Sequence, residues 1–212
     1  MPKDILLVGE PMALFIAQEM GDLSEVQTYR MAVAGAEFNV AVGLRRLGHA
    51  VRYCTRLGRD PFGGLVARRM AAEGLDTQGL LWTDDAPTGI MFKAKAREGD
   101  PDIHYRRRGS AAAGLAWRDL EALEVADYGY LHLTGILPAL SPSCREATFR
   151  LVAAAKAAGA TVCFDPNLRP QLWERQTDMA ACINALAYEA DYFLPGAGEG
   201  ERLMGSRDPE AI

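Results

Sequence analysis

The sequence has 212 residues, 49% of them hydrophobic, which is enough for one substantial core in a single globular domain. Because 28 aspartates and glutamates outnumber 23 lysines and arginines, the formal charge is -5, which argues against nucleic acid as a partner. The N-terminal stretch MPKDILLVGE has one lysine and a short apolar run, so it predicts a strand rather than a signal peptide or a membrane span. We therefore expect a cytoplasmic protein without a membrane partner.

Short apolar runs rich in β-forming residues alternate along the chain with segments of helical periodicity. The strands are expected at residues 5–9, 51–56, 128–133, 161–165 and 191–195, and the helices near 37–47, 62–73, 143–158 and 177–189. Such alternation is typical of a parallel sheet with helices on both faces. The sequence therefore predicts an α/β fold of the doubly wound class.

Two segments interrupt this alternation. Residues 11–33 and 88–110 lack sustained helical periodicity, and each contains two extended runs separated by turn residues, GD in the first and EGDPD in the second. We interpret them as hairpins that pair with each other in a small second sheet. This sheet is either a lid over a site or a set of edge strands without a function of its own.

The first expected helix begins in the stretch GAEFNVAVGLRRLG, residues 35–48, where Asn39 interrupts an otherwise apolar side. One interpretation is local, because asparagine caps helix N-termini and satisfies free backbone donors. The other is that the helix mouth faces a ligand, with Gly35 allowing close approach and Asn39 binding hydroxyl groups. The stretch by itself leaves both open.

Polar loops follow three of the predicted strands, at the edge where ligands bind in doubly wound sheets. The residues of interest in these loops are Gly135, Asp165, Asn167, Arg169, Gly196 and Glu199. Glycine, arginine and carboxylates together suit phosphate and metal, although Arg169 alone could be an ordinary loop cation. The sequence contains neither a P-loop nor a dinucleotide-binding fingerprint, and GAGEGE also suits a simple turn between strand and helix.

The second predicted hairpin ends in HYRRRGS. On a strand, Tyr105 and Arg107 project to the same face, while Arg106 and Arg108 project to the other. A phenol beside a guanidinium suits a substrate carboxylate, which the planar fork of arginine binds through two hydrogen bonds. The alternative is a solvated basic edge strand that discourages aggregation.

Together these motifs resemble the ribokinase-like (PfkB) family of sugar kinases, and within it the 2-keto-3-deoxygluconate kinase branch. The resemblance extends over the whole chain, and FDPNLRPQLW and GAEFNVAVGLRRLG are its most specific parts. The stretches that carry it are GEPM (9–12), GAEFNVAVGLRRLG (35–48), TGIMF (88–92), HYRRRGSA (104–111), LHLTGILPALSPSCRE (131–146), FDPNLRPQLW (164–173) and LPGAGEGERLMG (194–205).

The resemblance implies a Rossmann-like core with a β lid, through which such proteins often form homodimers. It also implies transfer of the γ-phosphoryl group of ATP, with Mg²⁺, to a sugar acid such as 2-keto-3-deoxygluconate, giving the 6-phosphate. Gly35, Ala36 and Asn39 match positions that hold sugar hydroxyls, so Asn39 is expected to face the sugar, with capping as a second use of the same geometry.

The remaining site residues are implied in the same way. Tyr105 and Arg107 match the pair that recognises the acid sugar, and Arg169 matches an arginine that reaches substrate and phosphate, with Asn167 on the phosphate side. Glu199 matches the glutamate that acts on magnesium through water.

Two departures from the family pattern limit the substrate and the chemistry. Met91 stands where this branch commonly has tyrosine, so the sugar could differ and a fructokinase or ribokinase activity is an alternative. The G-A-G-D motif with the catalytic base is missing, so we expect the base to lie beyond Ile212 and this chain to be inactive alone. A non-catalytic sugar-binding remnant is the third possibility.

Overall fold

The computed structural model describes residues 4–208 and 210, and its main layer is a six-stranded sheet. The sheet order is β10-β9-β8-β1-β4-β5, and all neighbouring strands are parallel, which confirms the predicted α/β class. The strands are β1 (Asp4–Val8), β4 (Val51–Gly58), β5 (Leu80–Thr83), β8 (Tyr128–Thr134), β9 (Thr161–Asp165) and β10 (Tyr192–Phe193).

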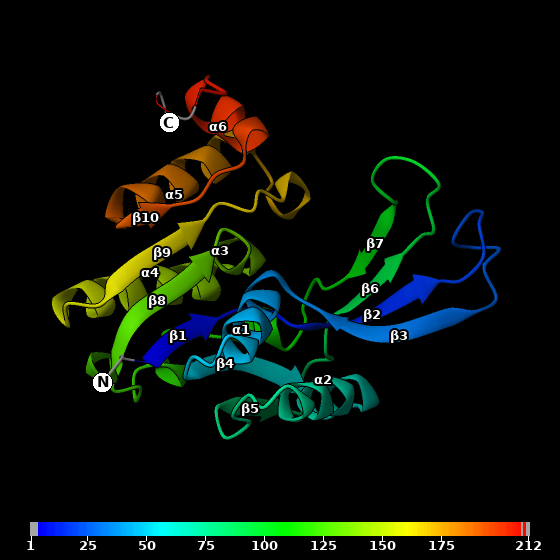
Figure 1. The fold of residues 1–212 in the computed structure, drawn as a ribbon, viewed down its shortest axis with the longest axis horizontal. Helices are drawn as coiled ribbons and strands as arrows, with labels where there is room; N and C mark the ends of the chain where they lie inside the picture. Colours follow the sequence, from blue (N-terminus) through cyan, green and yellow to red (C-terminus); the bar gives the residue numbers. More distant parts are fainter. Residues whose placement is uncertain (1–3, 209, 211–212) are drawn as a thin grey trace.

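Helices cover both faces of this sheet (Figure 1). Alternate residues of β1 belong to different cores: Leu6 and Val8 pack with residues of α4 and α5, whereas Leu7 packs with residues of α1 and α2. This division follows from the two-residue period of a strand, which turns successive side chains to opposite faces. The helices are α1 (Ala36–Arg46), α2 (Pro61–Ala72), α3 (Leu137–Leu140), α4 (Pro142–Ala157), α5 (Gln176–Glu189) and α6 (Ala197–Met204).

Local sequence explains where two of the helices begin. Asp60 accepts hydrogen bonds from the backbone N–H groups of Phe62 and Gly63, and Ser141 accepts one from that of Cys144. In both helices a proline follows the capping residue, at a position where its missing N–H costs nothing.

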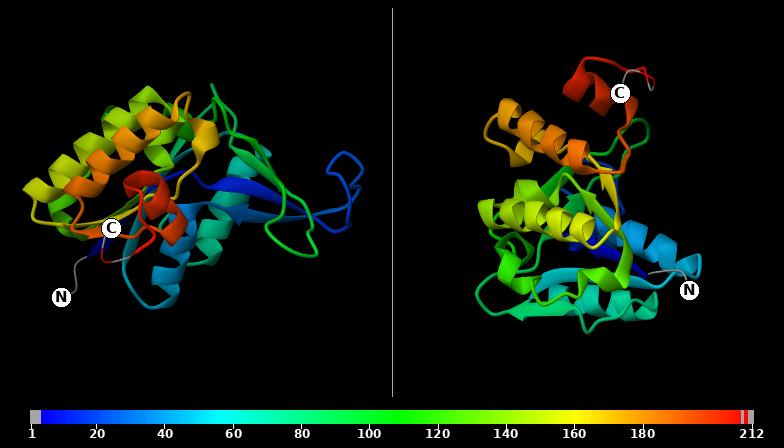
Figure 2. Two further views of the ribbon diagram at one scale, coloured as in Figure 1. Left: turned by 90° about the horizontal axis from the view of Figure 1, so that it is seen from above. Right: turned by 90° about the vertical axis from the view of Figure 1, so that its left-hand side faces the viewer.

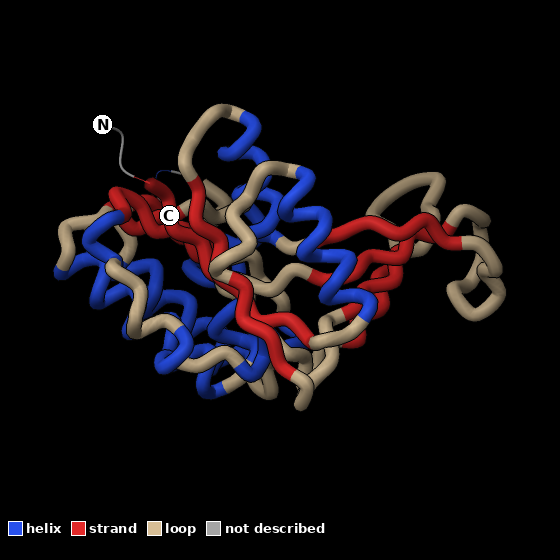
Figure 3. Tube along the Cα trace, turned by 90° about the horizontal axis from the view of Figure 1, so that it is seen from below, coloured by secondary structure: helices blue, strands red, loops and turns tan. Residues whose placement is uncertain are grey.

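A second sheet of four strands stands beyond the carboxyl ends of the main sheet, and it projects from one end of the molecule (Figures 1, 2 and 3). Its order is β3-β2-β6-β7. Each interrupted segment forms an antiparallel hairpin and the two hairpins share one sheet, as predicted, and the structure shows that β2 and β6 pair in parallel. The strands are β2 (Met12–Ala17), β3 (Tyr29–Ala34), β6 (Ile90–Lys93) and β7 (Ile103–Arg106).

Aromatic packing fixes the second sheet to the main body. The ring of Phe15 on β2 lies 5.6 Å from that of Phe62 on α2, and 5.1 Å and 6.3 Å from those of Phe92 and Tyr29 on its own sheet. Edge-to-face and offset ring pairs at these distances are favourable beyond the area they bury. The sheet is therefore anchored on α2, and its role as a lid stays a prediction.

Among the strands and α-helices within residues 4–208, β5, α3 and α6 have no counterpart among the predicted ones. β5 and α3 have only four residues each, too few to establish a period. No helix within residues 4–208 combines the length and the apolar character needed to cross a bilayer.

Candidate functional site

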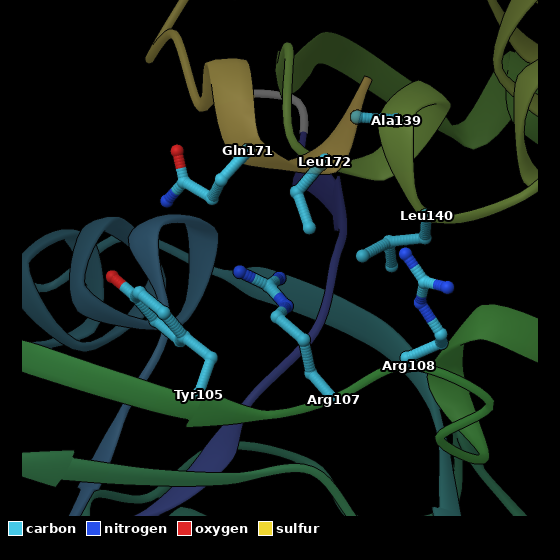
Figure 4. A pocket seen from close by; sticks show the side chains of 7 residues that line it. All are labelled: Tyr105, Arg107, Arg108, Ala139, Leu140, Gln171 and Leu172. Atoms are coloured by element: carbon cyan, nitrogen blue, oxygen red, sulfur yellow. The ribbon is translucent and has the colours of Figure 1, made fainter. Parts of the chain in front are cut away.

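A cavity of about 330 Å³ lies between the second sheet and the loops that follow β8 and β9. Figure 4 shows its polar side, where Tyr105 and Arg107 point toward Gln171 and Leu172, and Arg108 lies beside Leu140. The opposite wall is formed by α3, which follows β8, and by a short 3₁₀ helix, Pro170–Leu172, which follows β9. The complete lining is Tyr105, Arg107, Arg108, Ala139, Leu140, Gln171 and Leu172.

The structure brings Tyr105 and Arg107 together, as predicted, but the expectation that Arg108 points the other way is wrong. Strand β7 ends at Arg106, and the chain then turns through Gly109, whose φ of 68° is the left-handed conformation that suits glycine. Strand alternation therefore stops before Arg107, and Arg108 lines the same cavity. The guanidinium of Arg107 lies over the Tyr105 ring, 5.5 Å from its centre. This cation–π contact stabilises the side chains of both residues in their positions at the cavity.

Arg107 already has an acidic partner inside the protein. Its Nε donates to Glu10 Oε2 at 2.7 Å, its Nη2 also contacts that oxygen, and the two side chains are 5% and 0% exposed. Ser110 donates its hydroxyl to the other Glu10 oxygen at 2.5 Å. Sequence reasoning gave Glu10 no role, although it lies in the GEPM stretch (9–12), two residues after the end of β1 at Val8. The free two-pronged clamp predicted for Arg107 is therefore half occupied.

The N-terminus of α1 is not capped by Asn39. The N-cap is Gly35, no side chain bonds to the free backbone donors there, and Asn39 lies inside the helix, so the prediction that Asn39 caps it is wrong. Gly35 is glycine because a Cβ would come within 2.8 Å of the Glu10 carbonyl oxygen. Asn39 is exposed and lines a separate hollow with Phe38 and Arg46, while Ala36 is half-buried at the first helical position.

A second buried carboxyl, Glu37, connects this helix to the end of β8. Thr134 donates its hydroxyl to Glu37 Oε1 at 2.6 Å, and Glu37 Oε2 has no partner among the described residues. Burial raises the pKa of Glu37 to about 7, because the charged form is poorly solvated there and the Thr134 bond only partly offsets this. Sequence reasoning did not assign Glu37 a role.

The loops after β8, β9 and β10 lie at one edge, as predicted, because these strands are neighbours in a parallel sheet. Gly135 is required by local packing, since a Cβ there would collide with the carbonyl oxygen of Pro166. Arg169 is half-buried and donates from Nη1 to the carbonyl of Leu168 at 2.8 Å, outside the residues that line the cavity.

Asn167 and Glu199 stabilise the backbone of this edge. Asn167 has a φ of 36°, a region that asparagine tolerates, and its N–H and amide donate to Asp165. Glu199 accepts from the backbone N–H of Leu168 at 2.7 Å and from that of Gly196 at 3.0 Å.

Magnesium fits this edge only as an ion bound largely by phosphate and water. No group of three or more His, Cys, Asp or Glu side chains within residues 4–208 could hold a metal. Each oxygen of Glu199 uses one lone pair on a backbone donor and keeps another for a water molecule, in agreement with the way Mg²⁺ retains its waters. The expected catalytic base beyond Ile212 lies outside the described residues.

A parallel sheet with helices on both faces, a small second sheet beyond its carboxyl edge and a cavity lined by two arginines are the features of an α/β protein with a site suited to a small anionic molecule. The model of the pfkB family carbohydrate kinases matches residues 2–212. The chain belongs to this family.

Individual relatives agree with the family match. The chain is 42% identical over 213 residues to 2-dehydro-3-deoxygluconokinase of Bacillus subtilis (strain 168), covering 100% of this chain and 66% of that protein. It is 29% identical over 202 residues to fructokinase-1 of Oryza sativa subsp. japonica, covering 95% and 62%. A crystal structure of a PfkB protein from Polaromonas sp. JS666 superposes with a TM-score of 0.94 at 40% identity, covering 99% and 71%. The chain thus spans slightly less than two thirds of these two curated relatives.

Proposed function

We propose that this chain carries the sugar-binding part of a kinase that phosphorylates a sugar acid, 2-keto-3-deoxygluconate, to its 6-phosphate. One observation carries the substrate class: Tyr105, Arg107 and Arg108 line one cavity, so a phenol and two guanidinium groups face the same space. Cationic donors of this kind suit a carboxylate better than a neutral hydroxyl. The 42% identity to 2-dehydro-3-deoxygluconokinase supports the same substrate.

The hydroxyl groups of the sugar are assigned to the beginning of α1, where Gly35 is the N-cap, Ala36 is the first helical residue and Asn39 follows three residues later. The exposed amide of Asn39 is free to bind, because it does not cap the helix. Asn39→Asp removes the amide donor but keeps the size of the side chain, so sugar affinity should fall while the unfolding transition stays in place. Unchanged affinity in a calorimetric titration would remove Asn39 from the site.

ATP with Mg²⁺ is the proposed phosphoryl donor, on the side of the loops after β9 and β10. Arg169 would reach the phosphate and the substrate, Asn167 would lie on the phosphate side, and Glu199 would hold Mg²⁺ through water. Bound Mg²⁺ would neutralise charge on the phosphates during transfer. The amides that bind Glu199 fix the direction of its remaining lone pairs.

A fructokinase type of activity is the second candidate, and Met91 favours it. This side chain pairs with Tyr105 across the second sheet, is 9% exposed and offers no hydrogen-bond donor to an acid sugar. The 29% identity to a plant fructokinase points the same way. A sugar-binding remnant without phosphoryl transfer is the third candidate.

The substrate proposal is tested by titrating the 212-residue chain with 2-keto-3-deoxygluconate and with fructose in a calorimeter. The acid sugar should bind at least tenfold more tightly, because a charged hydrogen bond contributes roughly 1.5 to 3 kcal/mol. Tyr105→Phe should reduce this preference, whereas Tyr29→Phe should not, since the Tyr29 hydroxyl bonds to Leu23 outside the cavity. Equal or tighter binding of fructose would favour the second candidate.

Assembly and location complete the proposal. The second sheet would form a homodimer or a higher oligomer and close over the sugar, as in related kinases, and the cytoplasm is the predicted compartment. Gel filtration with light scattering tests the oligomeric state directly.

A further inference from the structure

Glu10 connects segments that are far apart in the sequence. Its carboxylate bonds to Arg107 and Ser110, which lie 97 and 100 residues further along the chain. The residue itself follows β1 and precedes β2, at the point where the chain passes from the main sheet to the second sheet. Glu10 therefore ties the end of the second hairpin to the beginning of the first.

Two glycines from different motifs leave the space that Glu10 occupies. A Cβ on Gly89 would come within 2.8 Å of Glu10 Oε1, and a Cβ on Gly35 would come within 2.8 Å of the Glu10 carbonyl oxygen. Gly89 directly precedes β6, and Gly35 begins α1. Both residues thus allow the carboxylate and its backbone to sit at the junction of the helix mouth with the second sheet.

The pair with Glu10 determines which edge of Arg107 is free. A guanidinium offers two edges for two-pronged binding: one formed by Nε and Nη2, and the other formed by Nη1 and Nη2. Glu10 Oε2 lies against the first edge, because both Nε and Nη2 contact it. The end formed by Nη1 is left for the cavity, toward which the side chain points in Figure 4.

The charges in the cavity also indicate that the direction of Arg107 matters. Glu10 cancels the charge of Arg107 within a buried pair, so Arg108 supplies the remaining positive charge in the lining of the cavity. Arg107 then recognises a ligand by direction more than by net charge.

We propose that Glu10 is a positioning residue for acid-sugar recognition: it holds Arg107 so that its Nη1 end meets the carboxylate of the sugar. This inference rests on the proposed function. Glu10 does not touch the sugar and acts only through Arg107, so its removal should affect acid sugars far more than neutral ones. A carboxylate that only stabilised the fold would affect both sugars alike.

The experiment is a calorimetric double-mutant cycle on the 212-residue chain, with 2-keto-3-deoxygluconate and fructose as ligands. Glu10→Gln should weaken binding of the acid sugar about three- to tenfold, the factor expected when binding must order one long side chain. Fructose binding should change less than about twofold, within the usual error of additivity. Unchanged or tighter binding of the acid sugar by Glu10→Gln would overturn the proposal.

The double variant keeps the test decisive if Glu10→Gln does not fold. Arg107→Met and Glu10→Gln/Arg107→Met are compared, because the double variant leaves neither charge of the pair buried alone. Equal affinities of these two variants for the acid sugar support a role through Arg107, whereas a further loss of tenfold or more in the double variant contradicts it. If the unmodified chain does not prefer the acid sugar, the proposed function fails instead, and this outcome is seen before any variant is made.

Discussion

The two sides of the candidate site are built differently. On the side of the second sheet, Glu10 and Arg107 form a buried pair that fixes the wall of a cavity. On the side of β10, Arg169 turns back to a neighbouring carbonyl, and Tyr192 and Leu194 are 59% and 53% exposed. The proposed sugar side is thus preorganised by a buried pair, while on the proposed phosphate side Arg169 and Glu199 bind backbone groups.

A buried ion pair is weak evidence for stability, because the cost of removing both charges from water offsets their attraction. Its value here is that it fixes the position of Arg107, since Glu10 accepts hydrogen bonds from both Arg107 and Ser110 and also contacts Nη2 of Arg107. The predictions that follow test this contrast between the two sides, from the largest expected effect to the smallest.

Turnover should show the largest difference. The residues that line the cavity include no carboxylate or histidine that could accept the proton of a sugar hydroxyl. A missing base costs about 10²- to 10⁴-fold, so the 212-residue chain should bind the acid sugar but phosphorylate it more slowly than about 0.1 per second. A coupled ADP-release assay measures this. Turnover above about 1 per second would mean that a carboxylate of this chain is the base.

Loss of the Arg107 side chain should have the next largest effect. Arg107→Ala leaves the Glu10 charge buried without its cation, so the free energy of unfolding should fall by about 3 to 5 kcal/mol. The matched control is Arg175→Ala, which breaks an exposed pair with Asp178 and should change the free energy of unfolding far less. Urea unfolding measures both, and similar losses would contradict the contrast.

Stability should depend on pH through Glu37. Its pKa is raised from 4.5 to about 7 in the folded chain, so the unfolded chain ionises first and stability falls as pH rises between these values. The fall should be roughly 3 kcal/mol, since each pH unit contributes about 1.4 kcal/mol over this window.

Glu37→Gln provides the comparison for that pH dependence. The amide oxygen can still accept a hydrogen bond from the Thr134 hydroxyl, but the amide does not titrate. The free energy of unfolding of the variant, relative to that of the original chain, should therefore increase as pH rises from 5 to 8. Parallel stability profiles of the two proteins would show that Glu37 does not change its protonation state on folding in this range.

The smallest effect is expected on the phosphate side. Glu199→Ala removes the acceptor of two backbone N–H groups, one part-buried and one exposed, so it should cost about 1 kcal/mol, as the loss of a helix cap does. Acid-sugar affinity should stay unchanged, because Glu199 does not line the cavity. A loss of affinity beyond about threefold would show that the two sides are coupled by more than roughly 0.6 kcal/mol.

Much of the fold followed from local pattern. Helices α1, α2, α4 and α5 each begin one residue before the predicted start, because apolar periodicity and capping residues are local signals. The two hairpins were also predictable from turn chemistry. Short elements such as β5 and α3 were not, since four residues carry no period.

The candidate site was less predictable for three physical reasons. The Glu10–Arg107 pair joins residues 97 positions apart, and no periodicity encodes which acid meets which base across such a distance. Arg108 was placed on the wrong side because strand alternation was extended past Arg106, where the chain leaves the sheet. Asn39 was judged a possible cap because asparagine is a common capping residue. The cap is Gly35 instead, and no side chain bonds to the free backbone donors there.

The most direct measurement is a crystal structure of the chain with 2-keto-3-deoxygluconate bound. The carboxylate of the sugar acid should lie in the cavity beside Arg107, within about 3 Å of its Nη1 and of the Tyr105 hydroxyl, with the Glu10–Arg107 pair intact. A carboxylate turned away from both residues, or an acid sugar bound only in the hollow beside Asn39, would contradict the assignment of this cavity.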